Sequence, residues 1–173
     1  MPIPSTAIAL ALLAEKSELV ERSRLQPYLE QLQHPAAAIK TPRDCALAMV
    51  KEELITLFQA KLLLQGKWKN FFIAGKYKVL EHLGSGGMGT VYLCEHRYMR
   101  RRVAIKLLPP EKGATGTSLE RFRREARAAA KLDHPNVVQA HDIDQDGPIH
   151  FLVMEYIDGI SIQHLVDSHG PRS

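Results

Sequence analysis

The spacing of apolar residues changes once along this chain, and that change limits what the chain can fold into. Up to about Gly66 apolar side chains recur at the spacing of a helix face, and no alternating stretch occurs. After Gly75 the period becomes that of a strand, beginning with the run over residues 77–82. We therefore expect two parts, a helical region over residues 1–70 and a mixed α+β domain over residues 76–173.

The first part carries the start and stop signals of helices. Thr41 followed by Pro42 is typical of a helix start, since proline at the first helical position loses no needed hydrogen bond. Gly66 is typical of a helix stop. Four apolar residues return at a constant offset of 35, with Leu12, Leu19, Val20 and Leu29 followed by Leu47, Leu54, Ile55 and Leu64. This offset indicates either a duplicated helical pair or a coincidence among leucine-rich helices.

The second part reads as three strands, one helix and two further strands. A capping box of the type T-x-x-E, Thr117 and Glu120, marks the start of the helix. The apolar face of that helix is expected to hold Leu119, Phe122, Ala126, Ala129 and Ala130. The strands are expected over residues 77–84, 89–96, 102–108, 137–143 and 149–154, the last two joined by the hairpin signal Asp146-Gly147. This order predicts a five-stranded antiparallel sheet with one principal helix.

Composition excludes several classes of protein. Hydrophobic residues make up 45% of the chain and charged residues 24%, the balance of a globular protein rather than of a disordered tail. The basic stretch 97–131 lacks the aromatic platform of a nucleic-acid site, so we expect a solvated surface there. Cys45 and Cys94 lack metal-ligand spacing and are expected to be free thiols of a cytoplasmic protein. The early apolar run 7–14 is too short to span a membrane, so no membrane segment is expected in this chain.

A glycine-rich segment follows the first expected strand. Gly84, Gly86 and Gly89 spell G-x-G-x-x-G, a pattern that dinucleotide-binding folds share. In those folds the glycines lead into a helix, whereas here residues 90–93 continue as a strand. A hairpin turn without a ligand is the alternative interpretation. With Gly87, however, four glycines fall within six positions, more than a turn needs, and they remove the side chains that would block phosphate oxygens.

A second feature of nucleotide sites lies on the third expected strand, in the run Val103-Ala104-Ile105-Lys106. Alternation places Ala104 and Lys106 on one face of this strand. A strand that binds a nucleotide needs a small residue beside the flat base. It also needs an ammonium two positions further on that faces the phosphates. A strand lysine on its own is most often solvated, but the preceding glycine-rich segment favours the nucleotide site.

Five sequence blocks make the chain resemble the eukaryotic-like Ser/Thr protein kinases of bacteria. They occur in that family's order as LGSGGMGTVY at 83–92, VAIK at 103–106, RFRREA at 121–126, HPN at 134–136 and LVMEY at 152–156. The resemblance implies the N-terminal lobe of a kinase, with ATP and Mg²⁺ as cofactors. The helical part is similar to a region found ahead of such kinases, which suggests a regulatory or docking role for it.

The resemblance also implies a role for each matching residue. Lys106 is expected to contact the α- and β-phosphates and to pair with Glu125, these two being the catalytic residues of the lobe; a surface acid is the alternative for Glu125. Met154 is expected to lie behind the adenine as gatekeeper, or to be purely structural. Asp158 is placed near the ribose or the substrate. The other expected nucleotide contacts are Leu83, Val91 and Ala104 around the adenine, Glu155 and Ile157 through backbone groups, and Gly84, Ser85, Gly86, Gly87, Met88, Gly89 and Thr90 in the loop.

A complete kinase also needs an H-R-D-x-x-x-x-N segment and a D-F-G segment, which supply the catalytic base and the metal ligands. Neither occurs in these 173 residues, so no metal ligand is assigned here. The leading hypothesis is the ATP-binding part of a kinase that phosphorylates Ser/Thr hydroxyls of protein substrates, inactive without a C-terminal lobe. The alternative is a non-catalytic nucleotide-binding or interaction module that docks onto another kinase. The surface that a C-terminal lobe would cover predicts self-association.

Overall fold

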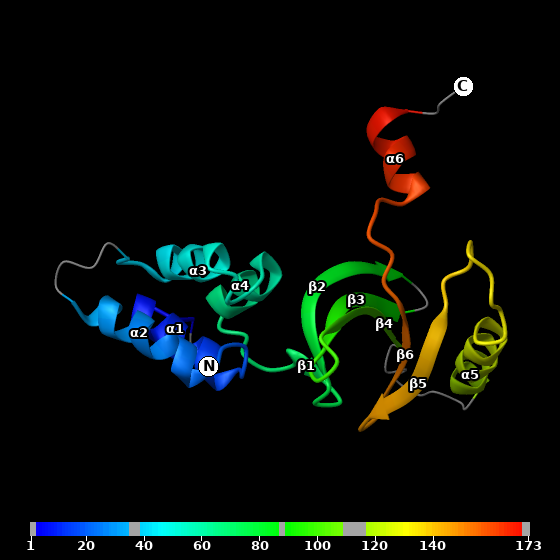
Figure 1. The fold of residues 1–173 in the computed structure, drawn as a ribbon, viewed down its shortest axis with the longest axis horizontal. Coiled ribbons are helices and arrows are strands. Elements are labelled where there is room, and N and C mark those ends of the chain that lie inside the picture. Colours follow the sequence, from blue (N-terminus) through cyan, green and yellow to red (C-terminus); the bar gives the residue numbers. More distant parts are fainter. Residues whose placement is uncertain (1–2, 35–38, 87–88, 109–116, 171–173) are drawn as a thin grey trace.

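The computed structural model describes residues 3–34, 39–86, 89–108 and 117–170. Figure 1 shows helices α1–α4 gathered at one end of the molecule and a curled sheet at the other. Helix α5 lies beside the sheet, and helix α6 projects away from it toward the C-terminus. The change of apolar spacing in the sequence therefore marks a change from helices to strands.

The four N-terminal helices begin and end at the signals in the sequence. They are α1 (Ala7–Lys16), α2 (Arg22–Gln33), α3 (Pro42–Lys51) and α4 (Leu57–Leu64). Thr41 caps α3 in a reciprocal capping box with Asp44, and Pro42 is the first helical residue. Gly66 follows α4 with a φ of 75°, a left-handed conformation that favours glycine. The expected start at Thr41 and stop at Gly66 are both confirmed.

The 35-residue offset is a structural repeat. Helices α3 and α4 begin 35 residues after α1 and α2, at 42 against 7 and at 57 against 22. The turns inside the two pairs also match, because Glu18 and Glu53 have φ values of 59° and 55°. Leu19 and Leu54 then donate their N–H groups to carbonyl oxygens five residues earlier, at 3.2 and 2.9 Å. A duplicated helical pair explains these matches, and coincidence does not.

The helical part has its own apolar core. Its fully buried side chains come from all four helices and include Leu10, Leu25, Cys45, Met49 and Leu63. The repeat extends to the outer surface as well, since the equivalent residues Leu12 and Leu47 are both exposed. Each pair thus buries one face and leaves the other in solvent, as amphipathic helices do.

The second part is a six-stranded antiparallel sheet. Its strands are β1 (Phe72–Ile73), β2 (Tyr77–Gly86), β3 (Gly89–His96), β4 (Arg101–Leu107), β5 (Ala140–Asp146) and β6 (Ile149–Glu155). They are ordered β1-β2-β3-β4-β6-β5. The expected sheet had five strands, and the additional one is β1, whose two residues are too few to show an alternation. The main helix α5 (Thr117–Ala129) and the short α6 (Ile162–His169) complete the chain.

The core of the sheet lies on the face opposite the predicted nucleotide residues. Phe151 and Ile105 are fully buried there, with Val103 and Val153 nearly so. The Tyr77 ring packs edge-on against Phe151 at a centroid distance of 6.0 Å. Val103 and Ile105 point into this core, which confirms the alternation expected along β4.

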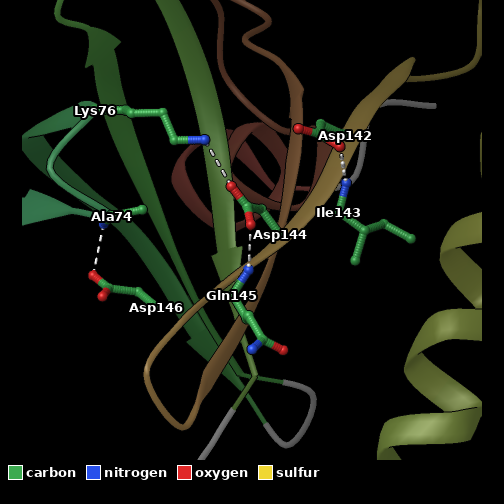
Figure 2. A network of polar contacts seen from close by, with 7 residues as sticks. All are labelled: Ala74, Lys76, Asp142, Ile143, Asp144, Gln145 and Asp146. Carbon is green, nitrogen blue, oxygen red and sulfur yellow. Dashed lines mark hydrogen bonds and ion pairs between the residues drawn. The ribbon is translucent and has the colours of Figure 1, made fainter.

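Two polar contacts join the ends of the sheet, which lie far apart in strand order (Figure 2). In the turn between β1 and β2, the Lys76 ammonium donates to Asp144 of β5 at 2.8 Å. The Ala74 N–H donates to the Asp146 carboxylate at 2.6 Å. A second oxygen of Asp144 accepts the N–H of Gln145 at 2.8 Å. These bonds hold the curl of the sheet between its first and last strands.

Helix α5 packs against β5 (Figure 1). Phe122 and Ala126, one turn apart, form its buried face. Among the other residues expected on that face, Ala129 is half-buried and Ala130 is exposed, while the side chains of Leu119 and Thr117 lie outside the described part. No helix within the described ranges is long and apolar enough to cross a membrane.

Candidate functional site

The glycine-rich segment forms the hairpin between β2 and β3. Gly84 lies opposite Val91, Ser85 opposite Thr90, and Gly86 opposite Gly89. The chain continues from the glycines into a strand, as expected, and not into a helix. Gly87 and Met88, which the sequence places at the tip, lie outside the described residues.

The three described glycines of this hairpin differ in whether their backbone conformation favours glycine. Gly89 has a φ of 116°, which residues with side chains rarely adopt. A Cβ at Gly84 or Gly86 would meet no atom within 4 Å, and neither has a left-handed φ. Neither packing nor backbone conformation therefore requires glycine at these two positions.

The polar side chains of the hairpin form a short chain of contacts. The Ser85 hydroxyl donates to the Thr90 hydroxyl oxygen at 3.2 Å, across the two strands. The His82 ring nitrogen Nε2 lies 2.7 Å from the same Ser85 oxygen. The His82 ring also packs edge-on against Tyr92, with centroids 5.5 Å apart. These contacts fix the two arms of the hairpin relative to each other.

Strand register brings the other predicted nucleotide residues next to the hairpin. Lys106 of β4 lies opposite Val91 of β3, and Ala104 lies opposite both Leu93 of β3 and Met154 of β6. Ala104 is nearly buried, while the Lys106 side chain is half-exposed. The lysine is therefore one strand away from the glycine-rich arm, and the small residue is next to the proposed gatekeeper.

The end of β6 is held to the chain that precedes β5. The Glu155 N–H donates to the Gln139 carbonyl at 3.0 Å, and the Gln139 N–H donates to a Glu155 carboxylate oxygen at 2.8 Å. Beyond this tie Ile157 is 59% exposed. The Tyr156 hydroxyl donates to Asp158 at 3.4 Å, and partial desolvation together with the Asp158 charge raises the pKa of Tyr156. Glu155 is thus the last residue of β6, and Ile157 follows it in an exposed segment, while their contacts with a nucleotide stay a prediction.

Glu125 lies on α5, between the buried residues Phe122 and Ala126, but its own side chain is exposed. The ion pairs within the described ranges do not include one between Glu125 and Lys106. The pairing of these two residues stays a prediction. The described residues also hold no group of three or more His, Cys, Asp or Glu side chains that could bind a metal.

Two residues that face the sheet were not singled out in the sequence. Thr56 and Gln59 form the capping box of α4, and both also donate to carbonyl oxygens of β2. The T-x-x-Q pattern that precedes an apolar run was the available signal for the cap. Nothing in the sequence indicated the strand as its second partner.

Comparison with known proteins identifies the family of the sheet-forming part. A profile of the protein kinase domain matches residues 77–173. The serine/threonine-protein kinase PrkC of Bacillus subtilis is 40% identical over 99 residues, which cover 57% of this chain and 15% of PrkC. The serine/threonine-protein kinase PknB of Mycolicibacterium smegmatis is 37% identical over 103 residues, which cover 57% of this chain and 16% of PknB.

Among solved structures, a double mutant of the Mycobacterium tuberculosis PknI kinase domain superposes with a TM-score of 0.50 at 34% identity. That match covers 58% of this chain and 40% of the PknI chain. The chain therefore spans a minor part of each relative that it matches. Since the kinase profile matches more than half of its residues, the chain belongs to the protein kinase domain family, and its sheet-forming part is related to bacterial serine/threonine kinases.

Proposed function

We propose that the sheet with α5, within residues 76–173, is the ATP-binding lobe of a protein serine/threonine kinase. The observation that carries this proposal is the pair Gly84 and Gly86, where glycine is required neither by packing nor by φ. In a kinase, glycines at such positions allow the backbone to approach the phosphates of ATP. The lobe would supply nucleotide binding to the transfer of the γ-phosphate onto Ser/Thr hydroxyls of protein substrates.

In this proposal the strands divide the nucleotide between them. The apolar side chains of Leu83, Val91 and Ala104 enclose the adenine, with Met154 behind it. Backbone groups of Glu155 and Ile157 bind the edge of the base, and Asp158 lies toward the ribose or the substrate. The ammonium of Lys106 meets the α- and β-phosphates, and Glu125 would orient it when α5 takes its active position.

The catalytic base and the magnesium ligands would come from elsewhere. Phosphoryl transfer depends on positioning and on metal-borne stabilisation of charge, and neither an H-R-D nor a D-F-G segment occurs in the sequence. We therefore expect these 173 residues to bind nucleotide weakly and to transfer no phosphate. We expect this lobe to work in the cytoplasm with ATP and Mg²⁺.

The test is nucleotide binding by the chain, measured with a fluorescent ATP analogue. Lys106→Met should weaken binding by roughly ten- to a hundredfold, since it removes a charge-assisted contact with phosphate. Lys131→Met, at an exposed site beyond α5, is the matched control and should bind as the wild type does. Equal affinity of the wild type and Lys106→Met would contradict the proposal. Phosphate transfer from radiolabelled ATP that Lys106→Met abolishes would contradict the expectation that these 173 residues are inactive alone.

Gly86→Ala tests directly whether glycine at this position serves nucleotide binding. Because the added Cβ meets no neighbouring atom, the melting temperature should stay within about 2 °C of the wild type, an ordinary surface effect. Nucleotide affinity should fall, since the methyl group occupies space that the phosphates need. Unchanged nucleotide affinity in Gly86→Ala would contradict the proposal that this glycine makes room for the phosphates.

A second function, a non-catalytic module that docks onto another kinase, is favoured by the apolar residues exposed after β6. Ile157, Ile160 and Ile162 are 59%, 65% and 81% exposed. A separately expressed kinase C-terminal lobe should bind this surface. Binding of that lobe without any gain of phosphate transfer would favour the docking function over the catalytic one.

A further inference from the structure

Strand β2, which leads into the glycine-rich hairpin, contains a β-bulge. Val79 lies opposite Cys94 of β3, and Glu81 lies opposite the next residue of β3, Leu93. Leu80 is therefore an extra residue without a partner across the strands. A bulge bends its strand and increases the local twist, and such bulges are frequent next to functional sites.

The capping box of α4 binds the two carbonyl groups at this bulge. The Gln59 amide donates to the Val79 carbonyl oxygen at 2.6 Å, and the Thr56 hydroxyl donates to the Leu80 carbonyl oxygen at 2.6 Å. The same two side chains accept each other's backbone N–H groups, at 2.9 Å from Thr56 and 3.2 Å from Gln59. Gln59 is fully buried and Thr56 is half-buried, so the Gln59 amide relies on these partners within the protein.

Other contacts bring both helical pairs to the same strands. The Lys78 ammonium, on β2 beside the bulge, donates to the Leu19 carbonyl at the turn between α1 and α2, at 2.9 Å. The Phe58 ring of α4 lies 6.2 Å from the Tyr92 ring of β3. The helical part is thus attached to the two strands that form the hairpin, and not only tethered to the lobe through the linker.

We infer that Thr56 and Gln59 are positioning residues of the nucleotide site. They hold the bulge at Leu80, which lies four residues before Gly84, and a second register shift falls between His82 and Gly84. The direction in which β2 enters the hairpin therefore depends on a contact made by the helical part. This inference rests on the proposed nucleotide binding, because it names the residues that preset the phosphate-binding backbone.

Gln59→Glu separates the two roles of Gln59. The carboxylate still accepts the Thr56 N–H and keeps the capping box, in which Glu is as suitable as Gln. When ionised it cannot donate to the Val79 carbonyl, and it places a charge in a fully buried site, so the contact with the sheet is lost and the buried charge adds to the effect. We expect nucleotide affinity to fall by at least about fivefold, the effect of one net hydrogen bond, and amides of residues 82–86 and 89–91 to exchange at least about tenfold faster with solvent.

Protonation should reverse this defect. At low pH a protonated Glu at position 59 carries a donor again, so the ratio of variant to wild-type affinity should return toward one as the pH falls. A merely structural loss of packing would show no such pH dependence.

The two capping boxes of the second helical pair provide a matched control. Thr56→Ala and Thr41→Ala each remove the N-cap of a helix, but only Thr56 donates to the sheet, while the Thr41 hydroxyl donates to Asp44 at 2.7 Å. Thr56→Ala should weaken nucleotide binding and loosen the hairpin, Thr41→Ala should do neither, and Thr56→Ser, which keeps a hydroxyl, should restore both.

Equal hairpin exchange rates in the wild type, Gln59→Glu and Thr56→Ala would overturn the inference, and so would equal loosening in Thr41→Ala. If the wild-type chain binds no nucleotide, the proposed function fails, whereas the exchange rates still decide whether the α4 contact positions the hairpin. If Gln59→Glu does not fold, the Thr56→Ala and Thr56→Ser pair carries the same test.

Discussion

Replacing Phe151 by alanine should destabilise the kinase lobe and leave the helical part nearly unaffected. Phe151 is fully buried in the core of the sheet and packs edge-on against Tyr77. A Phe→Ala change at such a site costs about 3 to 5 kcal/mol, from lost burial, the cavity and the lost ring contact. The buried residues of the helical core form a separate cluster, and the partly buried Phe58 of α4 packs against the sheet core without belonging to it.

The two cysteines report on the two cores separately. Cys45 is fully buried among the helices and Cys94 is fully buried in the sheet. Pulse labelling of both thiols across a urea series, read by mass spectrometry, therefore gives one unfolding midpoint for each part. With a urea slope of about 2 kcal/mol per molar, Phe151→Ala should lower the Cys94 midpoint by about 2 M.

A surface change in the same part of the chain is the control. Leu132 is 52% exposed, so Leu132→Ala should move neither midpoint measurably. A Cys94 midpoint within about 0.5 M of the wild type in Phe151→Ala would refute the assignment of Phe151 to the core of the lobe.

Three further outcomes follow from the structure. At pH 8 without denaturant neither thiol should react with iodoacetamide within an hour, since burial raises the pKa of Cys45 to about 11 and that of Cys94 to about 12; fast labelling would contradict this. The hydrogen bond from Lys76 lowers the pKa of Asp144 below its usual 3.8. The ionised Asp144 therefore stabilises the folded state fully above about pH 4, and this contribution is lost as the pH falls further. Asp144→Asn should weaken the dependence of the free energy of unfolding on pH below about pH 4. The exposed apolar side chains of Leu83, Ile157 and Ile162 should make the chain self-associate, and sedimentation as a stable monomer at high concentration would show otherwise.

Strong local patterns made most of the fold predictable. The strands at the glycine-rich segment and at the Val103–Lys106 run were expected within a residue or two, because their alternation is long and bounded by turns. The strand expected from Val137 begins three residues later, at Ala140. The Val137 N–H instead bonds the His134 carbonyl in a turn, and two adjacent valines looked like the start of the strand. Strand β1 was not predicted because two residues are too few to show an alternation of apolar and polar side chains.

The candidate site was predictable by type and not by mechanism. Glycine spacing located the hairpin, but the structure was needed to show that a Cβ at Gly84 or Gly86 would meet no neighbouring atom. The partners of Thr56 and Gln59 are backbone carbonyls 24 and 20 positions away, and any residue at the bulge would offer the same carbonyl groups. Side-chain patterns therefore could not reveal this contact.

The repeat shows how a duplicated helical pair acquired unequal halves. Thr56 and Gln59 correspond to Glu21 and Arg24 in the first pair, at the same offset of 35. Glu21 makes no side-chain cap bond, and both it and Arg24 are exposed, so water can satisfy the first N–H groups of α2. The start of α4 faces the β2 bulge, where Thr56 and Gln59 donate to the Leu80 and Val79 carbonyl groups. The two pairs agree in turn geometry and in buried positions and differ where one of them meets the sheet, so the demand for donors at the bulge explains the difference between them.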